Sequence, residues 1–170
     1  MGDVILKRPG KDEYYLKIAA EVAKRSTCLR RHFGAVIVRD DQIISTGYNG
    51  APRGSINCID LNDCPRQRAG IPPGERYELC RSVHAEMNAI IHASRQDMLG
   101  STLYVVCIDP KTGEWIDGIK PCKLCTRMII NAGIAWVVTG DGSGGIHRYS
   151  VAKFVEEDRA EWTPENMTGY

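Results

Sequence analysis

Residues 82–91 have the sequence Ser-Val-His-Ala-Glu-Met-Asn-Ala-Ile-Ile, and the apolar run Leu-Tyr-Val-Val-Cys-Ile follows at 103–108. In the first stretch, apolar side chains recur at the spacing of an amphipathic helix, namely at Val83, Met87, Ile90 and Ile91. The second stretch is typical of a buried strand. A predicted helix at 122–131 and a predicted strand at 134–138 continue the alternation. This order predicts an α/β fold, with a central mixed, largely parallel sheet and helices on both faces.

Upstream of this stretch, the pattern predicts a helix followed by a hairpin. The helix is expected at 12–24, and two strands at 34–38 and 43–44 flank a turn at 39–41. The segment 49–79 is rich in Cys, Pro and Gly and is predicted to lack regular structure. Because so long a loop in a compact domain is usually functional or tied by a metal, it is a candidate for either role.

Length and composition favour one domain. A chain of 170 residues, with 43% hydrophobic and 25% charged residues, can bury one core and is short for two. We expect a single domain over residues 1–170, with a core from about 12 to 140. The C-terminal segment, 141–170, has weaker signals: a helix is predicted near 151–160, and the last residues are expected to form an arm or a frayed tail.

Charge and hydropathy narrow the classes of function. The formal net charge of +1 gives little non-specific attraction to nucleic acid, which favours a small substrate. No stretch is long and apolar enough to span a bilayer, and the N-terminus lacks the apolar core of a secretory signal. We therefore expect a cytoplasmic protein with no membrane partner. The seven cysteines are then better explained by metal binding and buried thiols than by disulfides.

Two short motifs supply a set of metal ligands. His84 stands at the start of one predicted helix, and Cys122 and Cys125 belong to the run Pro-Cys-Lys-Leu-Cys that opens the next. One imidazole and two thiolates balance the charge of Zn²⁺ and leave its fourth tetrahedral position open for a water of pKa about 7. Pro121 suits the first turn of a helix, whose N-terminus favours thiolates at both cysteines. The Cys pair alone would also fit a redox dithiol or half of a zinc knuckle.

Glu86 is the candidate general acid and base. Residues two apart on a helix face different ways, so Glu86 is better placed beside a metal-bound water than as a further ligand behind His84. A carboxylate there can take a proton from water, protonate a ring nitrogen and help an amine leave as ammonia. With the three ligands, this is the minimum set for hydrolytic deamination of a nucleobase. The alternative is a catalytically idle zinc scaffold that senses nucleotides, which has no use for this carboxylate.

Four further cysteines flank or occupy the 49–79 segment: Cys28, Cys58, Cys64 and Cys80. Four thiolates would make a closed, structural zinc site that orders this loop, and buried free thiols are the alternative. Cys107, in an apolar strand, is predicted to lie in the core. The other histidines have no ligand partner at a telling spacing and are expected to be structural or on the surface: His32, His92 and His147.

Five stretches together resemble a known family: residues 26–28, 34–38, 47–52, 84–90 and 121–125. They are similar to the deoxycytidylate (dCMP) deaminases of the cytidine deaminase superfamily, over about residues 14–138. The resemblance implies a three-layer α/β/α, cytidine deaminase-like fold and conversion of dCMP to dUMP and ammonia. It also implies a homo-oligomer, often a hexamer, with dCTP and Mg²⁺ as activator and dTTP as inhibitor.

The same resemblance implies roles for residues around the motifs. Asn49 and Ala85 are expected to contact the substrate, Asn49 near its sugar, although Asn-Gly is also a routine turn dipeptide. The candidate effector-binding residues are Gly47, Tyr48 and Gly50.

Three arginines, Arg30, Arg31 and Arg53, could hold a phosphate through paired donors or could simply be solvated. The sequence offers no reason to choose among them.

Two segments depart from the family pattern. The loop 109–120 is longer and is expected to border the active site, so substrate choice could differ. The Gly-rich run 141–145 could approach a phosphate through backbone N–H groups or be a plain loop. The closest enzymatic alternative is another superfamily deaminase, acting on tRNA adenosine, guanine or a free nucleoside. A tRNA enzyme should have a basic docking face, which the near-neutral charge does not suggest.

Overall fold

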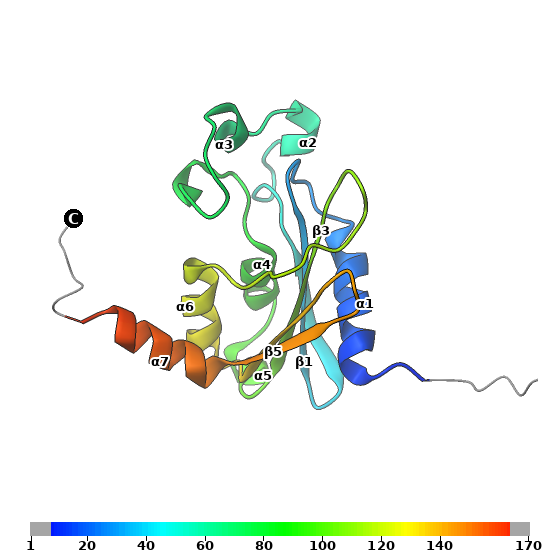
Figure 1. The fold of residues 1–170 in the computed structure, drawn as a ribbon, viewed down its shortest axis with the longest axis vertical. Helices are drawn as coiled ribbons and strands as arrows, with labels where there is room; N and C mark the ends of the chain where they lie inside the picture. Colours follow the sequence, from blue (N-terminus) through cyan, green and yellow to red (C-terminus); the bar gives the residue numbers. More distant parts are fainter. Residues whose placement is uncertain (1–7, 164–170) are drawn as a thin grey trace, which may run out of the picture.

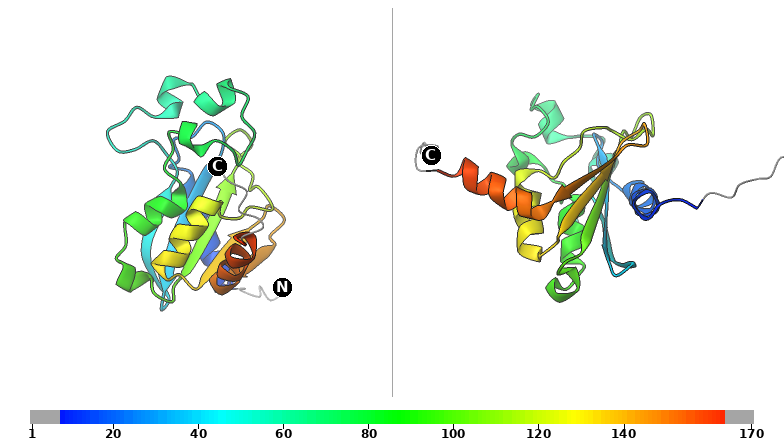
Figure 2. Two further views of the ribbon diagram at one scale, coloured as in Figure 1. Left: turned by 90° about the vertical axis from the view of Figure 1, so that its left-hand side faces the viewer. Right: turned by 60° about the horizontal axis from the view of Figure 1, so that its bottom comes forward.

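The computed structural model describes residues 8–163. Its centre is a five-stranded sheet in the order β2-β1-β3-β4-β5. The strands are β1 (His32–Arg39), β2 (Gln42–Tyr48), β3 (Thr102–Ile108), β4 (Trp136–Gly140) and β5 (Ile146–Ser150). One face of the sheet is covered by α1 (Lys11–Ala23), and the other by α4 (Ala85–Ile91) and α6 (Lys123–Ala132) (Figures 1 and 2). The expected three-layer α/β/α architecture is confirmed.

The sheet is mixed, as predicted, but the expectation that it is largely parallel is wrong. Among the described strands only β3 and β4 pair in parallel, whereas β1–β2, β1–β3 and β4–β5 are antiparallel. The strands linked through α4 and α6, namely β2, β3 and β4, do run in one direction. β1 lies between β2 and β3 and runs the other way, because a tight turn with positive φ at Asp40 and Asp41 folds β2 back onto it.

Each face of the sheet buries its own core. The α1 face is filled by residues that include Leu16, Ala19, Val36, Val106 and Val138. The opposite face is filled by residues that include Ile37, Ala89, Leu103, Ile129 and Val137.

Close approach of helix to strand requires glycine at two points. A Cβ at Gly34 would lie 2.0 Å from the carbonyl oxygen of Ala19, and one at Gly47 would lie 2.3 Å from that of Ala85. Gly47 therefore sets how closely α4 lies on β2.

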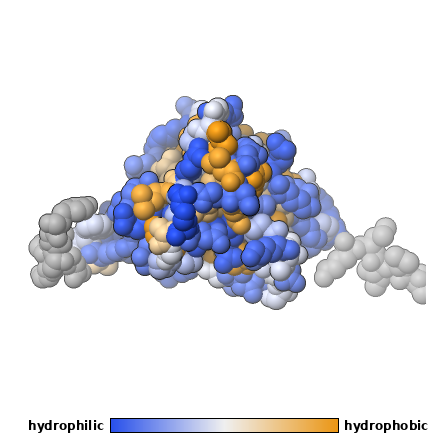
Figure 3. Space-filling view, turned by 90° about the horizontal axis from the view of Figure 1, so that it is seen from above, coloured by the Kyte–Doolittle hydropathy of each residue, from blue (hydrophilic) through white to orange (hydrophobic). Residues whose placement is uncertain are grey.

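The segment 49–79 contains regular structure, contrary to expectation. It has three one-turn helices: α2 (Cys58–Leu61), α3 (Pro65–Arg68) and η1 (Tyr77–Leu79). A capping box of Asn57 and Asp60 starts α2, and Pro65 stands in the first turn of α3. The segment caps one end of the sheet (Figure 1). Seen from that end, apolar side chains lie among polar ones (Figure 3), and the exposed apolar residues of the segment are Ile56, Ile59, Leu61 and Leu79.

Helix α4 is shorter than predicted. It begins at Ala85 rather than near Ser82, because Val83 is extended and forms a β-bridge with Gly50. It ends at Ile91, which was expected on the apolar side but is 66% exposed. The one-turn helix α5 (Arg95–Met98) follows, before β3.

The ordered chain continues past residue 140. β5 pairs with β4 and leads into α7 (Val151–Glu161), which confirms the helix predicted near 151–160. β5 itself was not predicted, because its residues are mostly exposed and lack an apolar pattern. Val151 and Phe154 belong to the core on the α4 face. The predicted terminal arm falls partly outside the described residues. Within residues 8–163, no helix has both the length and the apolar character needed to cross a membrane.

Candidate active site and metal centre

His84, Cys122 and Cys125 come together at the N-terminal ends of two neighbouring helices. His84 is the N-cap of α4, Cys122 is the N-cap of α6, and Cys125 lies in the first turn of α6. His84 Nδ1 is 3.5 Å from Cys122 Sγ and 3.3 Å from Cys125 Sγ. The three ligand atoms all lie within 4.8 Å of one another. One nitrogen and two sulfurs at this spacing fit three corners of a tetrahedral zinc site.

The pKa values of the two cysteine ligands are shifted in opposite directions. A hydrogen bond from Cys125, with a further one from His84, lowers the pKa of Cys122 to about 4. The same contact with Cys122, together with burial, raises the pKa of Cys125. Their mutual contact thus favours the thiolate at Cys122 and the thiol at Cys125 before metal binds, and ionisation of both cysteines by the helix end stays a prediction. Pro121 precedes the N-cap of α6 instead of occupying its first turn.

Glu86 lies beside this ligand set. It is in the first turn of α4, is 5% exposed and lines the same cavity as His84. Its carboxyl is hydrogen-bonded to Cys125, and burial raises the pKa of the carboxyl. A buried carboxyl next to a metal position is suited to accept and release protons during a reaction.

The ligand set opens into a cavity of about 420 Å³, which is within the range of small-molecule sites. Its walls come from the segment before β1, the 49–79 segment, the start of α4 and the loop 109–120, as predicted for that loop. Most of its charged residues are basic: Arg30, Arg31, Arg66, Arg81, Lys111 and Lys120 line it, against Glu86 and Asp109. A cavity with this balance attracts a small anionic ligand.

Two of the three candidate phosphate-binding arginines line the cavity, and the third does not. Arg30 and Arg31 line the cavity, and Arg31 Nη1 is 3.6 Å from Asp109 Oδ2. Arg53 is not among the lining residues, and its Nη2 is 3.2 Å from His92 Nε2. Sequence reasoning missed Arg66, which lines the cavity and is only 7% exposed. A single arginine in a segment without periodicity carries no local signal.

Comparison with known proteins identifies the family of this chain. The family model for the cytidine and deoxycytidylate deaminase zinc-binding region matches residues 9–141. The chain belongs to this deaminase family. The deoxycytidylate deaminase of Mycobacterium phage D29 is 40% identical to it over 138 residues, which are 78% of this chain and 96% of that protein. The deoxycytidylate deaminase of Schizosaccharomyces pombe is 37% identical over 131 residues, but the match covers only 37% of that longer protein.

Solved structures of deaminases have the same fold. The apo crystal structure of dCMP deaminase from the cyanophage S-TIM5 has a TM-score of 0.55 and 27% identity, covering 79% of this chain and 86% of that one. The structure of the cyanophage enzyme in complex with dCMP and dUMP also has a TM-score of 0.55, with 26% identity. A zinc-binding family and a His/Cys/Cys donor set together identify zinc as the metal, since thiolate and imidazole are ligands that suit it. The chain is a zinc-dependent deaminase.

In this deaminase, the predicted substrate residue Asn49 is buried in the cavity wall. Its Oδ1 accepts hydrogen bonds from Ser26 Oγ at 2.7 Å and from the Phe33 amide at 2.8 Å, and its Nδ2 donates to the Arg31 carbonyl at 2.9 Å. One Nδ2 hydrogen has no partner among the described residues. Asn49 thus connects three neighbouring residues by hydrogen bonds and retains one N–H donor for a ligand. Ala85, also buried, lines the same cavity.

The three candidate effector residues lie outside the cavity lining. Packing accounts for both glycines, because a Cβ at Gly50 would lie 2.5 Å from Thr27 Oγ1 and Gly47 contacts the backbone of α4. Tyr48 is 37% exposed, and its carbonyl accepts a hydrogen bond from Asn88 Nδ2 at 2.7 Å. Effector binding at these residues stays a prediction.

The four additional cysteines gather in one wall of the cavity. Cys28, Cys58, Cys64 and Cys80 all line it, and burial followed by the nearby Cys28 and Cys64 raises the pKa of Cys58. Among the described residues, however, no three of these sulfurs lie within 4.8 Å of one another. Cys107 is 1% exposed, which confirms that it belongs to the core.

The histidines that were expected to be structural make structural contacts. His32 Nε2 is 2.9 Å from the carbonyl of Cys28, and His92 Nδ1 is 3.0 Å from the carbonyl of Thr46. Each ring joins a strand or helix to a neighbouring segment.

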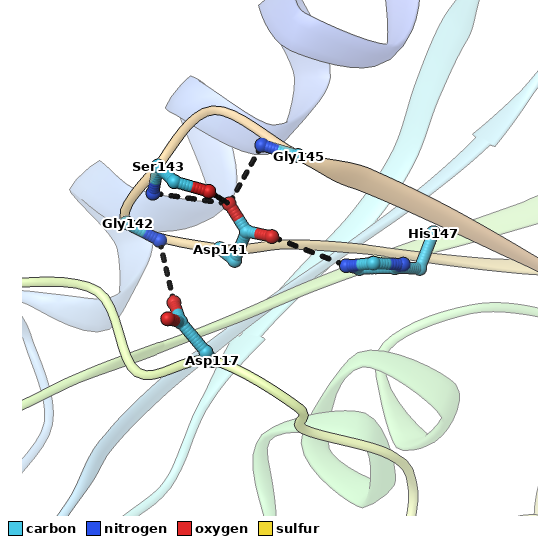
Figure 4. Close-up of polar contacts among 6 residues, drawn as sticks. All are labelled: Asp117, Asp141, Gly142, Ser143, Gly145 and His147. Atoms are coloured by element: carbon cyan, nitrogen blue, oxygen red, sulfur yellow. Dashed lines mark hydrogen bonds and ion pairs between the residues drawn. The ribbon is translucent and has the colours of Figure 1, made fainter.

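The Gly-rich run 141–145 folds around a carboxylate (Figure 4). Asp141 Oδ1 accepts hydrogen bonds from the amides of Ser143 at 3.0 Å and Gly145 at 2.6 Å, and its Oδ2 is 3.2 Å from His147 Nε2. In the same figure, the carboxylate of Asp117 accepts the amide of Gly142 at 2.8 Å. These amides are already used, so the run is a plain, internally bonded loop rather than a phosphate site.

The hydrogen bonds to Asp141 predict a pH dependence of stability. The contacts with Ser143 and Gly145 lower the pKa of Asp141 to about 2. Because this value lies below the unfolded value of about 3.9, the carboxylate stabilises the fold above that pH and loses its effect as the pH falls towards 2. Asp141→Asn is therefore expected to lower the melting temperature at pH 7, and the gap from wild type should narrow below about pH 4.

Thermal melts from pH 7 down to pH 3 test this expectation. Asp158→Asn, an exposed change on α7, serves as the control and should leave the melting temperature unchanged. An equal melting temperature of Asp141→Asn and wild type at pH 7 would contradict the role of Asp141.

Proposed function

We propose that this chain catalyses the hydrolytic deamination of dCMP to dUMP and ammonia, at the centre formed by His84, Cys122, Cys125 and Glu86. The observation that carries the proposal is the position of Glu86. A buried carboxyl stands beside a three-ligand zinc set and faces a cavity whose charges are mostly basic. A purely structural zinc site has four protein ligands and needs no such carboxyl. The chain's relatives named deoxycytidylate deaminase support the choice of substrate.

The chemistry divides between the metal and the chain. Zinc, when bound to His84, Cys122 and Cys125, makes a water molecule acidic enough to react at neutral pH. As the oxygen of the attacking water bonds to C4 of the cytosine ring, Glu86 accepts a proton from that water. Glu86 then delivers this proton to N3 of the ring. It then transfers the second proton of the water to the amino group, and the C4–N4 bond breaks to release ammonia. Water and dCMP are thereby converted to ammonia and dUMP, with the carboxylate of Glu86 restored.

The surrounding residues orient the substrate and exclude water. The spare Nδ2 donor of Asn49 is available to the sugar, and the backbone at Ala85 lies at the cavity wall next to Glu86. Tyr77 covers the ligand set from the 49–79 segment, with its ring centroid 4.9 Å from that of His84. Holding the reacting groups in one geometry is a large part of the catalysis available to such a site.

Ammonia release by zinc-loaded protein tests the proposal directly. We expect turnover of dCMP that exceeds turnover of CMP, deoxycytidine, dCTP and a tRNA anticodon stem, measured in parallel. Turnover of another substrate in preference to dCMP would keep the zinc chemistry and reject the substrate. No turnover of any of them would reject the enzyme in favour of a zinc scaffold.

We further propose that Cys28, Cys58, Cys64 and Cys80 bind a second, structural zinc. Their place in one wall supports this, and a bound ion would have to draw the sulfurs closer than they lie here. Zinc analysis should find two ions per chain in the wild type and one in Cys58→Ala. Cys107→Ala is the matched control and should keep two ions. One ion per chain in the wild type would instead mean buried free thiols.

The assembly and its regulation are also proposals from the family resemblance. We propose a homo-oligomer, with a hexamer favoured, that dCTP with Mg²⁺ activates and dTTP inhibits through a site near Gly47, Tyr48 and Gly50. The exposed apolar side chains Tyr48 and Ile91 support an interface on the β2 and α4 side. Light scattering and assays with each nucleotide test these points, and a monomer indifferent to both nucleotides would reject them.

A further inference from the structure

Arg66 is a buried cation with an unused donor in the wall of the active-site cavity. It lies in α3, is 7% exposed and lines the cavity. Its Nη2 donates to the carbonyl of Pro72 at 2.9 Å, and its Cζ lies 4.9 Å from the centroid of the Tyr77 ring. Its Nε is buried and has no hydrogen-bond partner within residues 8–163. The guanidinium is thus anchored through Nη2, and its Nε remains as a buried donor without a partner among the described residues.

Arg30, which lines the same cavity, carries a second unused donor. Its Nη1 is buried and has no hydrogen-bond partner in the part of the chain that the structure describes. Arg30 belongs to the segment before β1, far from Arg66 in the sequence. The ion pairs among the described residues include neither arginine. Burying a guanidinium donor without a partner is costly, so two such donors on arginines that line one cavity point to an anionic ligand.

Two of the other basic residues that line the cavity are already engaged. Arg31 is paired with Asp109, and Lys120 Nζ lies 5.0 Å from the centroid of the Tyr149 ring. Arg66 is also tied to the metal centre, because the Tyr77 ring that it contacts packs edge-on against His84. Tyr77 thus connects Arg66 to the metal centre through side-chain contacts.

We propose that Arg66, with Arg30, binds the 5′-phosphate of the substrate, so that the 49–79 segment selects nucleotides over nucleosides. The inference rests on the proposed function for the identity of the base. Guanidinium donors in a fixed planar fork bind phosphate with paired, charge-assisted hydrogen bonds, and a nucleoside has no group that could replace the phosphate. Arg66 is thus a specificity-determining residue.

Arg66→Met tests this, with Arg68→Met as the matched control. Arg68 lies in the same helix but is exposed and pairs with Asp63 at 2.9 Å. In Arg66→Met we expect KM for dCMP to rise about 10- to 100-fold, the range for a lost hydrogen bond to a charged group, with little change in kcat. The ratio of kcat/KM for dCMP to that for deoxycytidine should fall by the same factor. Arg68→Met should match the wild type.

A second probe separates this inference from the proposed function. Inorganic phosphate, titrated into zinc-loaded protein in a calorimeter, should bind at least tenfold more weakly to Arg66→Met than to wild type, and Arg30→Met should behave alike. Equal phosphate binding by wild type and both variants, or equal loss of kcat/KM on dCMP and deoxycytidine, would overturn the inference. Failure of the wild type to deaminate dCMP would reject the proposed substrate, whereas weaker phosphate binding in the variants would still support the phosphate site.

Discussion

Glu86→Gln should lower kcat for dCMP by about 10²- to 10⁴-fold, the contribution of a positioned general acid and base. Glutamine has the shape of glutamate and can accept a hydrogen bond, but it cannot carry the proton from water to N3 and then to the leaving amine. The carboxyl is 5% exposed beside Cys125, and the ligand set contains only His84, Cys122 and Cys125. Zinc content and dCMP binding should therefore stay close to wild type.

Three measurements together test the role of Glu86: kcat by ammonia release, zinc content by elemental analysis, and dCMP binding by calorimetry. Glu21→Gln, an exposed change on α1, is the control and should be neutral in all three. Loss of zinc in parallel with activity would make Glu86 a support for the metal site instead of a proton carrier. Retention of full activity would exclude Glu86 from the chemistry.

Cys122→Ser should abolish detectable deamination, because it removes a zinc ligand. A serine hydroxyl is not ionised at neutral pH and does not replace a thiolate on zinc. Even changes in groups that only support ligands cost about 10- to 100-fold in metal affinity, and the loss of a ligand should exceed that. The melting temperature should fall as well, because zinc bound to the folded state links the N-terminal ends of α4 and α6.

Elemental analysis and thermal melts with and without a chelator check this expectation. The melting temperature of the wild type should fall when a chelator removes the zinc. Cys122→Ser should melt, even without chelator, near the temperature of the chelator-treated wild type. Cys107→Ala is the matched control: this buried cysteine lies in β3 outside the ligand set, so the variant should keep its zinc. Wild-type zinc content in Cys122→Ser would show that Cys122 is not a ligand.

The metal centre could be predicted from the sequence because its residues mark local structure. His84 and Cys122 stand at helix N-caps, and Cys125 follows in the first turn, so each motif has its position within a short run of residues. Glu86 follows from His84 in the same way. Asn49 was also found by its motif, but its three hydrogen bonds to other segments became visible only in the fold.

Other features depend on distant partners and had no local signal. Arg66 is significant because its Nε is buried without a partner and because Tyr77 connects it to His84. Neither fact follows from the order of residues around position 66. The exposure of Ile91 likewise depends on where α4 meets the sheet, since its helical spacing alone placed it with the buried residues.

The sequence by itself determined most of the larger helices and strands, the ligand types and the presence of a carboxylate next to the metal ligands. These depend on apolar periodicity, capping and side-chain chemistry, which act over a few residues. The tertiary structure alone decided the strand directions, because β1 lies between β2 and β3. It also decided which basic groups enter the cavity, because burial and pairing of charges depend on contacts between segments far apart in the chain.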